Sequence, residues 1–181
     1  MIAIIPARSG SKRLKNKNIK IINGKPLIAY TIEQAKKAKK VTKVIVSTDC
    51  KNIARISKKF GAEVPFLRPK NLSNKKASLF NVCKYMMKKM EKLSAKKIES
   101  FIVLQPTSPM RSYKDIENSI GFFNKKKKAI FLASTVKSKP VEWYITLKKK
   151  KVFFNKMVLN KFKNMKYSNE FVLNGAIFIY S

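Results

Sequence analysis

The residues most able to do chemistry lie in a basic loop close to the start of the chain. A short apolar run ends at Pro6, and six basic side chains follow among positions 7–21, together with Ser9, Gly10 and Ser11. Small residues let a backbone bend around an anion and present its N–H groups, while lysine and arginine supply charged donors. The loop predicts a site for a nucleoside triphosphate; a flexible basic loop without a ligand is the alternative.

This loop follows neither common phosphate-binding pattern. It lacks the glycine and Lys-Ser/Thr spacing of a Walker P-loop, and it lacks the three glycines of the dinucleotide fingerprint. We expect Arg8 and Lys12 to supply fixed cationic donors and Lys17 to reach back from the far end of the loop. The neighbouring Lys15 and Lys20 are interpreted as solvated.

The overall charge invites a second interpretation, nucleic-acid binding. The formal net charge is +33, and lysine neutralises phosphate. However, arginine, the residue that reads bases bidentately, is scarce, and the lysines are spread over every predicted helix and loop. We therefore interpret most of them as a solvated coat and regard a nucleic-acid partner as unlikely.

The remaining composition bounds the class of protein. The 181 residues fit a single domain, 1–181, and no apolar run is long enough to cross a bilayer. The chain has no histidine, which removes the commonest general base, and Cys50 and Cys83 are expected to be reduced and buried. The apolar start followed by basic residues is opposite to a secretory signal. A cytoplasmic location follows as the default.

Strand and helix patterns alternate through the first two thirds of the chain. Short apolar runs predict buried parallel strands at 2–6, 43–48, 63–67 and 101–105. Helical spacing predicts helices over 26–39, with Pro26 at the first helical position, and over 51–60, 78–93 and 112–124, the last capped by Ser112. This order favours a doubly wound, mainly parallel α/β sheet.

The last third of the chain is different. Strand-like segments lie at 129–136, 141–147, 151–155 and 171–180 with no long helix between them, and we expect antiparallel or edge strands there. The lysine- and asparagine-rich stretch 148–166 fits no pattern well.

Five motifs in this order resemble the acylneuraminate cytidylyltransferases, the CMP-sialic acid synthetases and their relatives acting on legionaminic acid. They are IIPARSGSKRLKNKNI with GKPLIAYTI near the start, VSTD at 46–49, GAEVPFLRP at 61–69, LQPTSPMR at 104–111 and NGAIFI at 174–179. The LQPTSP form favours this group over the cytidylyltransferases for Kdo or pseudaminic acid.

The resemblance implies that CTP and a sialic-type nine-carbon 2-keto sugar acid give a CMP-sugar and pyrophosphate, with Mg²⁺ assisting. It implies Arg8 and Lys17 as the catalytic residues. The implied CTP-binding residues are Arg8, Ser11, Lys12, Lys17, Asn18, Arg68, Ala77 and Ser78. The implied sugar-acid residues are Gln105, Thr107, Ser108 and Asn174. Asp49 is either ligand-facing or structural, and Arg111 either pairs with a carboxylate or caps the following helix.

Three departures from the family qualify this. Lys75 stands where relatives carry an acidic residue, FKNMKYS at 162–168 replaces an Arg-Gln pair, and the chain ends at Ser181 before the Asp-x-Asp pair that binds magnesium in relatives. The resemblance thus implies a C-terminally truncated member, with a catalytically impaired nucleotide-binding remnant as the alternative. It also implies a homodimer.

Overall fold

The computed structural model describes residues 1–10, 14–74, 77–126, 128–137, 145–148, 151–154 and 171–181. These residues form two compact units, one made of residues 1–134 with 175–181 and the other of residues 135–174. The expectation of one cytidylyltransferase domain stays a prediction.

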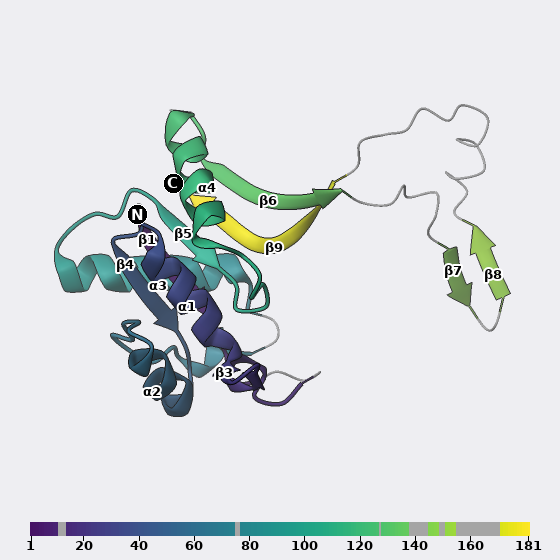
Figure 1. Cartoon of the computed structure of the whole chain (residues 1–181), viewed down its shortest axis with the longest axis horizontal. Helices are drawn as coiled ribbons and strands as arrows, with labels where there is room; N and C mark the ends of the chain where they lie inside the picture. Colours follow the sequence, from purple (N-terminus) through teal and green to yellow (C-terminus); the bar gives the residue numbers. More distant parts are fainter. Residues whose placement is uncertain (11–13, 75–76, 127, 138–144, 149–150, 155–170) are drawn as a thin grey trace. The chain divides into compact units, whose positions relative to one another are not determined.

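A five-stranded sheet forms the centre of the fold. Its strand order is β4 (Lys43–Ser47), β1 (Ile2–Pro6), β5 (Phe101–Leu104), β9 (Phe171–Tyr180) and β6 (Phe131–Lys137) (Figure 1). Strand β1 pairs in parallel with both β4 and β5, whereas β9 pairs with β5 antiparallel. The predicted α/β class with a mainly parallel sheet is confirmed, and so are antiparallel and edge strands from the last third of the chain.

The four helices follow the predicted ranges closely. They are α1 (Leu27–Lys37), α2 (Lys51–Lys59), α3 (Leu79–Ser94) and α4 (Tyr113–Lys125). Ser112 caps α4 as predicted, in a reciprocal pair with Asp115. Pro26 is not the first residue of α1 as predicted; it precedes the helix, in strand β3 (Lys25–Pro26), which pairs with β2 (Ile21–Ile22).

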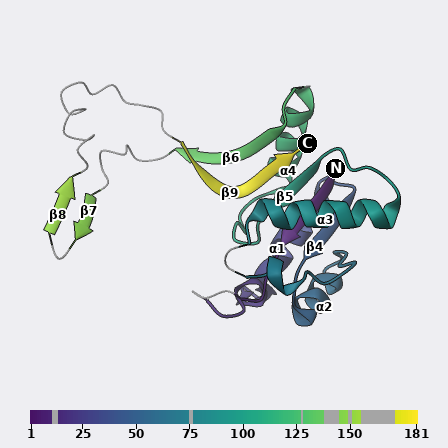
Figure 2. The ribbon, with the colours of Figure 1, turned by 180° about the vertical axis from the view of Figure 1, so that it is seen from behind.

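Helices cover both faces of the sheet because consecutive residues of its central strands are apolar, and these point to opposite faces. On β1, Ala3 and Ile5 pack with inner residues of α1, α2 and α4, such as Ile32. Ile4, on the opposite face, packs with Val82 and the methionines of α3. Figure 2, the view from behind, brings α3 to the front. The Met side chains of α3 are therefore core, as their spacing predicted.

The predicted strand at 63–67 does not form. Only Glu63 bridges the sheet, beside Ile45 at its edge, where it donates to the Val44 carbonyl and accepts from the Val46 N–H at 2.8 and 2.9 Å. Pro65 has no N–H with which to continue this ladder. The chain therefore turns away from β4 toward Arg68, whose N–H donates to the Thr48 carbonyl at 2.7 Å.

Three further expectations have an outcome here. The 135–174 unit contains an antiparallel hairpin of β7 (Ile145–Lys148), which overlaps the predicted segment 141–147, and β8 (Lys151–Phe154), which lies inside the predicted segment 151–155. Cys50 and Cys83 are both free, but only Cys83 is buried; Cys50 is half-buried. Among the described helices, none combines the length and the apolar character that crossing a bilayer requires.

Candidate active site

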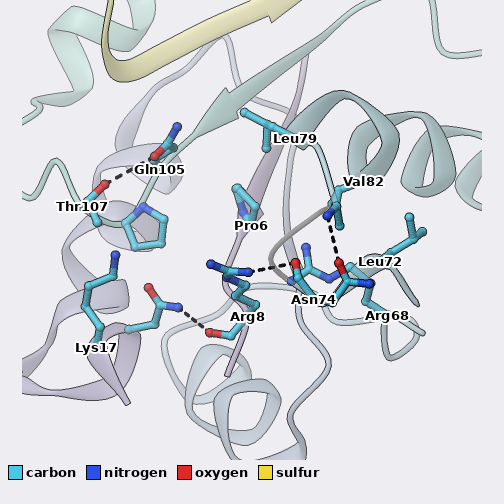
Figure 3. A pocket seen from close by; sticks show the side chains of 13 residues that line it. Pro6, Arg8, Lys17, Arg68, Leu72, Asn74, Leu79, Val82, Gln105 and Thr107 are labelled. Atoms are coloured by element: carbon cyan, nitrogen blue, oxygen red, sulfur yellow. Dashed lines mark hydrogen bonds between the residues drawn. The ribbon is translucent and has the colours of Figure 1, made fainter. Parts of the chain in front are cut away.

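A cavity of about 270 Å³ lies at the carboxyl ends of β1 and β5, where open parallel sheets commonly bind ligands (Figure 3). Pro6 ends β1, and Gln105 follows β5 directly. Thirteen residues line the cavity: Pro6, Arg8, Lys17, Asn18, Arg68, Leu72, Asn74, Ala77, Leu79, Val82, Gln105, Pro106 and Thr107. Three of them are cations, and none is a carboxylate. The cavity therefore suits an anion.

Hydrogen bonds on two sides of the opening loop fix the position of Arg8. The Ala7 N–H donates to the Ser47 carbonyl at 2.9 Å, and the buried Asn18 side-chain amide donates to the Arg8 carbonyl at 3.0 Å. The Arg8 guanidinium donates across the cavity to the Asn74 carbonyl at 2.9 Å (Figure 3). These contacts hold a half-buried cation at the cavity with its backbone immobilised.

Lys17 comes from the far end of the same loop, as the sequence predicted. It begins the short 3₁₀ helix η1 (Lys17–Ile19), which follows Asn16 in the left-handed conformation with φ of 57°. Lys17 is half-buried and lines the cavity beside Thr107, whereas Lys15 and Lys20 are exposed, in agreement with their interpretation as solvated.

Arg68 is the most buried of the three cations, with 6% of its surface exposed. Its Nε donates to Ser73 Oγ at 3.2 Å, and it forms no salt bridge with any described residue. Burial lowers the pKa of the guanidinium; Asp49 raises this pKa, and the like charge of Arg8 lowers it. A buried cation on a cavity without a carboxylate partner is an unfavourable arrangement that an anionic ligand would relieve.

The remaining predicted residues are placed as follows. Ala77, Gln105 and Thr107 line the cavity, and Thr107 Oγ1 donates to Gln105 Oε1 at 3.5 Å. Ser78 and Ser108 are not lining residues. Ser78 Oγ caps α3 by accepting from the Asn81 N–H at 3.1 Å, and the Ser108 N–H donates to the Gln105 carbonyl. The roles given to all of these residues stay predictions.

Several predicted positions cannot be compared with the cavity. Ser11, Lys12 and Lys75 lie outside the described residues, as does the segment 162–168. Asn174 belongs to the other compact unit, where its side-chain amide donates to the Thr135 carbonyl at 3.5 Å.

Sequence reasoning did not identify an apolar wall of the cavity, formed by Leu72, Leu79 and Val82. Leu79 and Val82 lie one turn apart at the start of α3, so helical spacing offered a signal for them. Leu72 ends the short 3₁₀ helix η2 (Lys70–Leu72), and no pattern singles it out. An apolar wall beside cations fits a ligand with a flat, partly apolar part and a charged part.

Arg111 neither forms a salt bridge with a described carboxylate nor caps the following helix. Its guanidinium donates to the carbonyls of Gln105 and Ala176 at 3.2 and 2.5 Å and to Thr31 Oγ1 at 3.0 Å. It thus binds the end of β5, strand β9 and helix α1 together. Burial lowers its pKa to about 10, with Asp115 acting in the opposite direction.

The described residues do not supply a magnesium site. No group of three or more His, Cys, Asp or Glu side chains lies close together among them. Asp49, the acidic residue considered for this role, has both carboxylate oxygens engaged by Ser9. Magnesium assistance stays an expectation from the resemblance.

Comparisons with known proteins identify the family of this chain. The profile of the family described as Cytidylyltransferase matches residues 2–169. An N-acylneuraminate cytidylyltransferase of Escherichia coli is 38% identical over 99% of this chain, which spans 42% of that protein's length. A CMP-N,N'-diacetyllegionaminic acid synthase of Legionella pneumophila is 33% identical over 99% of this chain and 77% of its own length.

A solved structure shares the fold. It is that of a CMP:2-keto-3-deoxy-manno-octonic acid synthetase complexed with CTP, with a TM-score of 0.74, 21% identity, and coverage of 99% of this chain and 73% of that one. The resemblance seen in the motifs is confirmed: the chain belongs to the cytidylyltransferase family, which includes acylneuraminate and legionaminic acid enzymes.

Proposed function

We propose that this chain binds CTP in the cation-lined cavity and transfers its cytidylyl group to a sialic-type nine-carbon 2-keto sugar acid. The observation that carries the proposal is the convergence of Arg8, Lys17 and Arg68 on one cavity that no carboxylate lines among the described residues. The names of the two relatives supply the nucleotide and the class of sugar acid.

The proposed reaction is an in-line transfer at phosphorus. The anomeric hydroxyl oxygen of the sugar acid attacks the α-phosphorus, the bond from that phosphorus to the oxygen bridging to the β-phosphate breaks, and pyrophosphate leaves. The hydroxyl proton is released. Such a transfer depends on positioning and charge stabilisation, so a chain without histidine can perform it.

Each cation has a distinct part in this proposal. Arg8 and Lys17 face the negative charge that develops on the phosphates during transfer. Arg68 is deeper, next to the apolar wall of Leu72 and Val82, and it orients the nucleotide before transfer. We expect the base or ribose to lie against this apolar wall.

The proposal is tested by measuring pyrophosphate release from CTP with N-acetylneuraminate, N,N'-diacetyllegionaminate or pseudaminate as acceptor. The expected result is release with at least one of the first two acids. Lys17→Ala should lower the rate on the order of 10²-fold, the cost of removing one preorganised stabilising group. Lys15→Ala is the matched control, because Lys15 is exposed on the same loop, and its rate should stay within about twofold.

The assay also separates the alternatives. A CTP-dependent rise in melting temperature without release from any acid would indicate a nucleotide-binding remnant. Absence of any CTP binding by folded protein would overturn the proposal altogether.

A further inference from the structure

Asp49 lies two residues after the end of β4 and does not line the cavity. Its two carboxylate oxygens are used by one residue of the opening loop: Oδ1 accepts from the Ser9 N–H at 2.9 Å, and Oδ2 accepts from Ser9 Oγ at 2.6 Å. Two such bonds to one neighbour fix both the backbone and the side chain of Ser9. The carboxylate therefore acts on the residue next to Arg8.

The residues at the end of β4 connect the loop that carries Arg8 to the segment that carries Arg68. Three consecutive residues contact these two segments. The Ser47 carbonyl accepts from the Ala7 N–H, and the Thr48 carbonyl accepts from the Arg68 N–H. Asp49 accepts two hydrogen bonds from Ser9. Arg8 and Arg68 are thus attached to one tripeptide. Loss of the Asp49 contact would release the loop side and leave the Arg68 side in place.

Charge adds a second effect to this geometry. Partial burial raises the pKa of Asp49, but the two hydrogen bonds from Ser9 and the charge of Arg68 outweigh it, so the pKa lies below its ordinary value. Asp49 is therefore ionised at neutral pH. Its negative charge raises the pKa of the Arg68 guanidinium, whereas the like charge of Arg8 lowers this pKa.

We propose that Asp49 is a positioning residue that preorganises the cavity for a nucleotide by fixing Ser9 and by balancing the charges of Arg8 and Arg68. This proposal rests on the nucleotide-binding function proposed above. If the cations of the cavity are already in position, their side chains and loops lose less conformational entropy on binding. The affinity for the ligand is correspondingly higher. Asp49 acts without touching the ligand, because it does not line the cavity.

The test is a double-mutant cycle read out by calorimetric titration of the full chain with CTP. Asp49→Asn should weaken CTP binding on the order of tenfold, the equivalent of losing a hydrogen bond to a charged group. Ser9→Ala should have a smaller effect, since the N–H bond survives. The double variant should bind no worse than Asp49→Asn alone, because both substitutions break one contact. Ser9→Thr, which keeps both hydrogen-bond donors, should bind CTP as tightly as the unsubstituted chain does.

The chain offers a matched control. In the cap of α4, Asp115 Oδ2 accepts from the N–H and the Oγ of Ser112, each at 2.8 Å, away from the cavity. Asp115→Asn should lower the melting temperature while CTP affinity stays within about twofold. Amide hydrogen exchange without ligand gives a second measurement, in which Asp49→Asn should accelerate exchange at Ser9.

The outcomes separate this inference from the function on which it rests. Unchanged CTP affinity in Asp49→Asn, or additive effects of the two substitutions, would overturn the positioning role while leaving CTP binding intact. Failure of the unsubstituted chain to bind CTP would overturn the proposed function and this inference with it.

Discussion

Arg68 and Arg111 are equally buried, with 6% of each residue exposed, yet their surroundings are opposite. Arg111 is surrounded by acceptors from three elements: the end of β5, strand β9 and helix α1. Arg68 donates through Nε to Ser73 Oγ and otherwise borders a cavity whose described lining holds Arg8 and Lys17 but no carboxylate.

The difference shows that burial alone does not reveal what an arginine does. A guanidinium presents five donors, and their acceptors decide its role. Where the protein supplies acceptors, as around Arg111, the cation joins elements and stabilises the fold. At Arg68 the guanidinium borders a cavity, and the cost of its burial outweighs the attraction of Asp49. This arrangement costs stability unless a ligand provides further negative charge.

The largest expected effect is on stability, at Arg111. Arg111→Met should lower the free energy of unfolding by roughly 3 kcal/mol, because the Thr31 hydroxyl and two carbonyls lose a buried donor. Urea unfolding followed by circular dichroism measures this change. A loss below about 0.5 kcal/mol, the range of an ordinary surface substitution, would mean that Arg111 does not join the elements.

The next effect is on ligand binding, at Arg68. Arg68→Met should weaken CTP binding by about 10- to 100-fold, which corresponds to one charge-assisted hydrogen bond. The unliganded protein should lose less than about 1 kcal/mol of stability, because the substitution removes a buried charge whose desolvation outweighs its attraction to Asp49. The CTP affinity of Arg68→Lys should lie between those of the unsubstituted chain and Arg68→Met, because lysine keeps the charge but not the planar guanidinium.

These two substitutions together define the comparison. If Arg68→Met unfolds the protein as readily as Arg111→Met does, and CTP affinity is unchanged in the folded fraction, both arginines are structural and the cavity loses its main support. Titration with CTP and urea unfolding, performed on both variants, distinguish these results.

The smallest effect is expected from exposed cations. Lys51, Arg55 and Lys58 lie on α2 and line a second cavity of about 390 Å³, but all three are exposed. Replacing the three with Gln should leave CTP affinity within about twofold, because solvent screens charges that it surrounds. A large loss of CTP affinity would show that net charge, and not convergence, holds the nucleotide.

Local signals made most of the core predictable. Apolar runs identified β1, β4 and β5, and helical spacing identified the four helices to within one or two residues. The prediction of a strand at 63–67 was wrong although the segment is apolar. Only Glu63 bridges the edge of the sheet, and Pro65 has no N–H with which to continue the ladder of hydrogen bonds. Pairing of β9 between β5 and β6 depends on contacts far apart in the chain, which no local pattern records.

The candidate site was predictable to a similar extent. Arg8, Lys17, Asn18, Arg68, Ala77, Gln105 and Thr107 came from motifs, and the structure brings all seven to one cavity. Leu72 and Asn74 were missed because they belong to an irregular segment with no periodicity. The contact between Asp49 and Ser9 was equally hidden, since 40 residues separate the partners.

The sequence by itself determined the class of fold, the basic loop after the first strand and the family, because periodicity, capping and contiguous motifs act over a few residues. Only the tertiary structure decided which basic residues converge and which are merely exposed. It also decided that Arg111 meets acceptors from Thr31 and Ala176 while Arg68 meets a cavity. The physical reason is that the electrostatic environment of a buried charge is set by residues distant in the chain, and the fold alone brings them together.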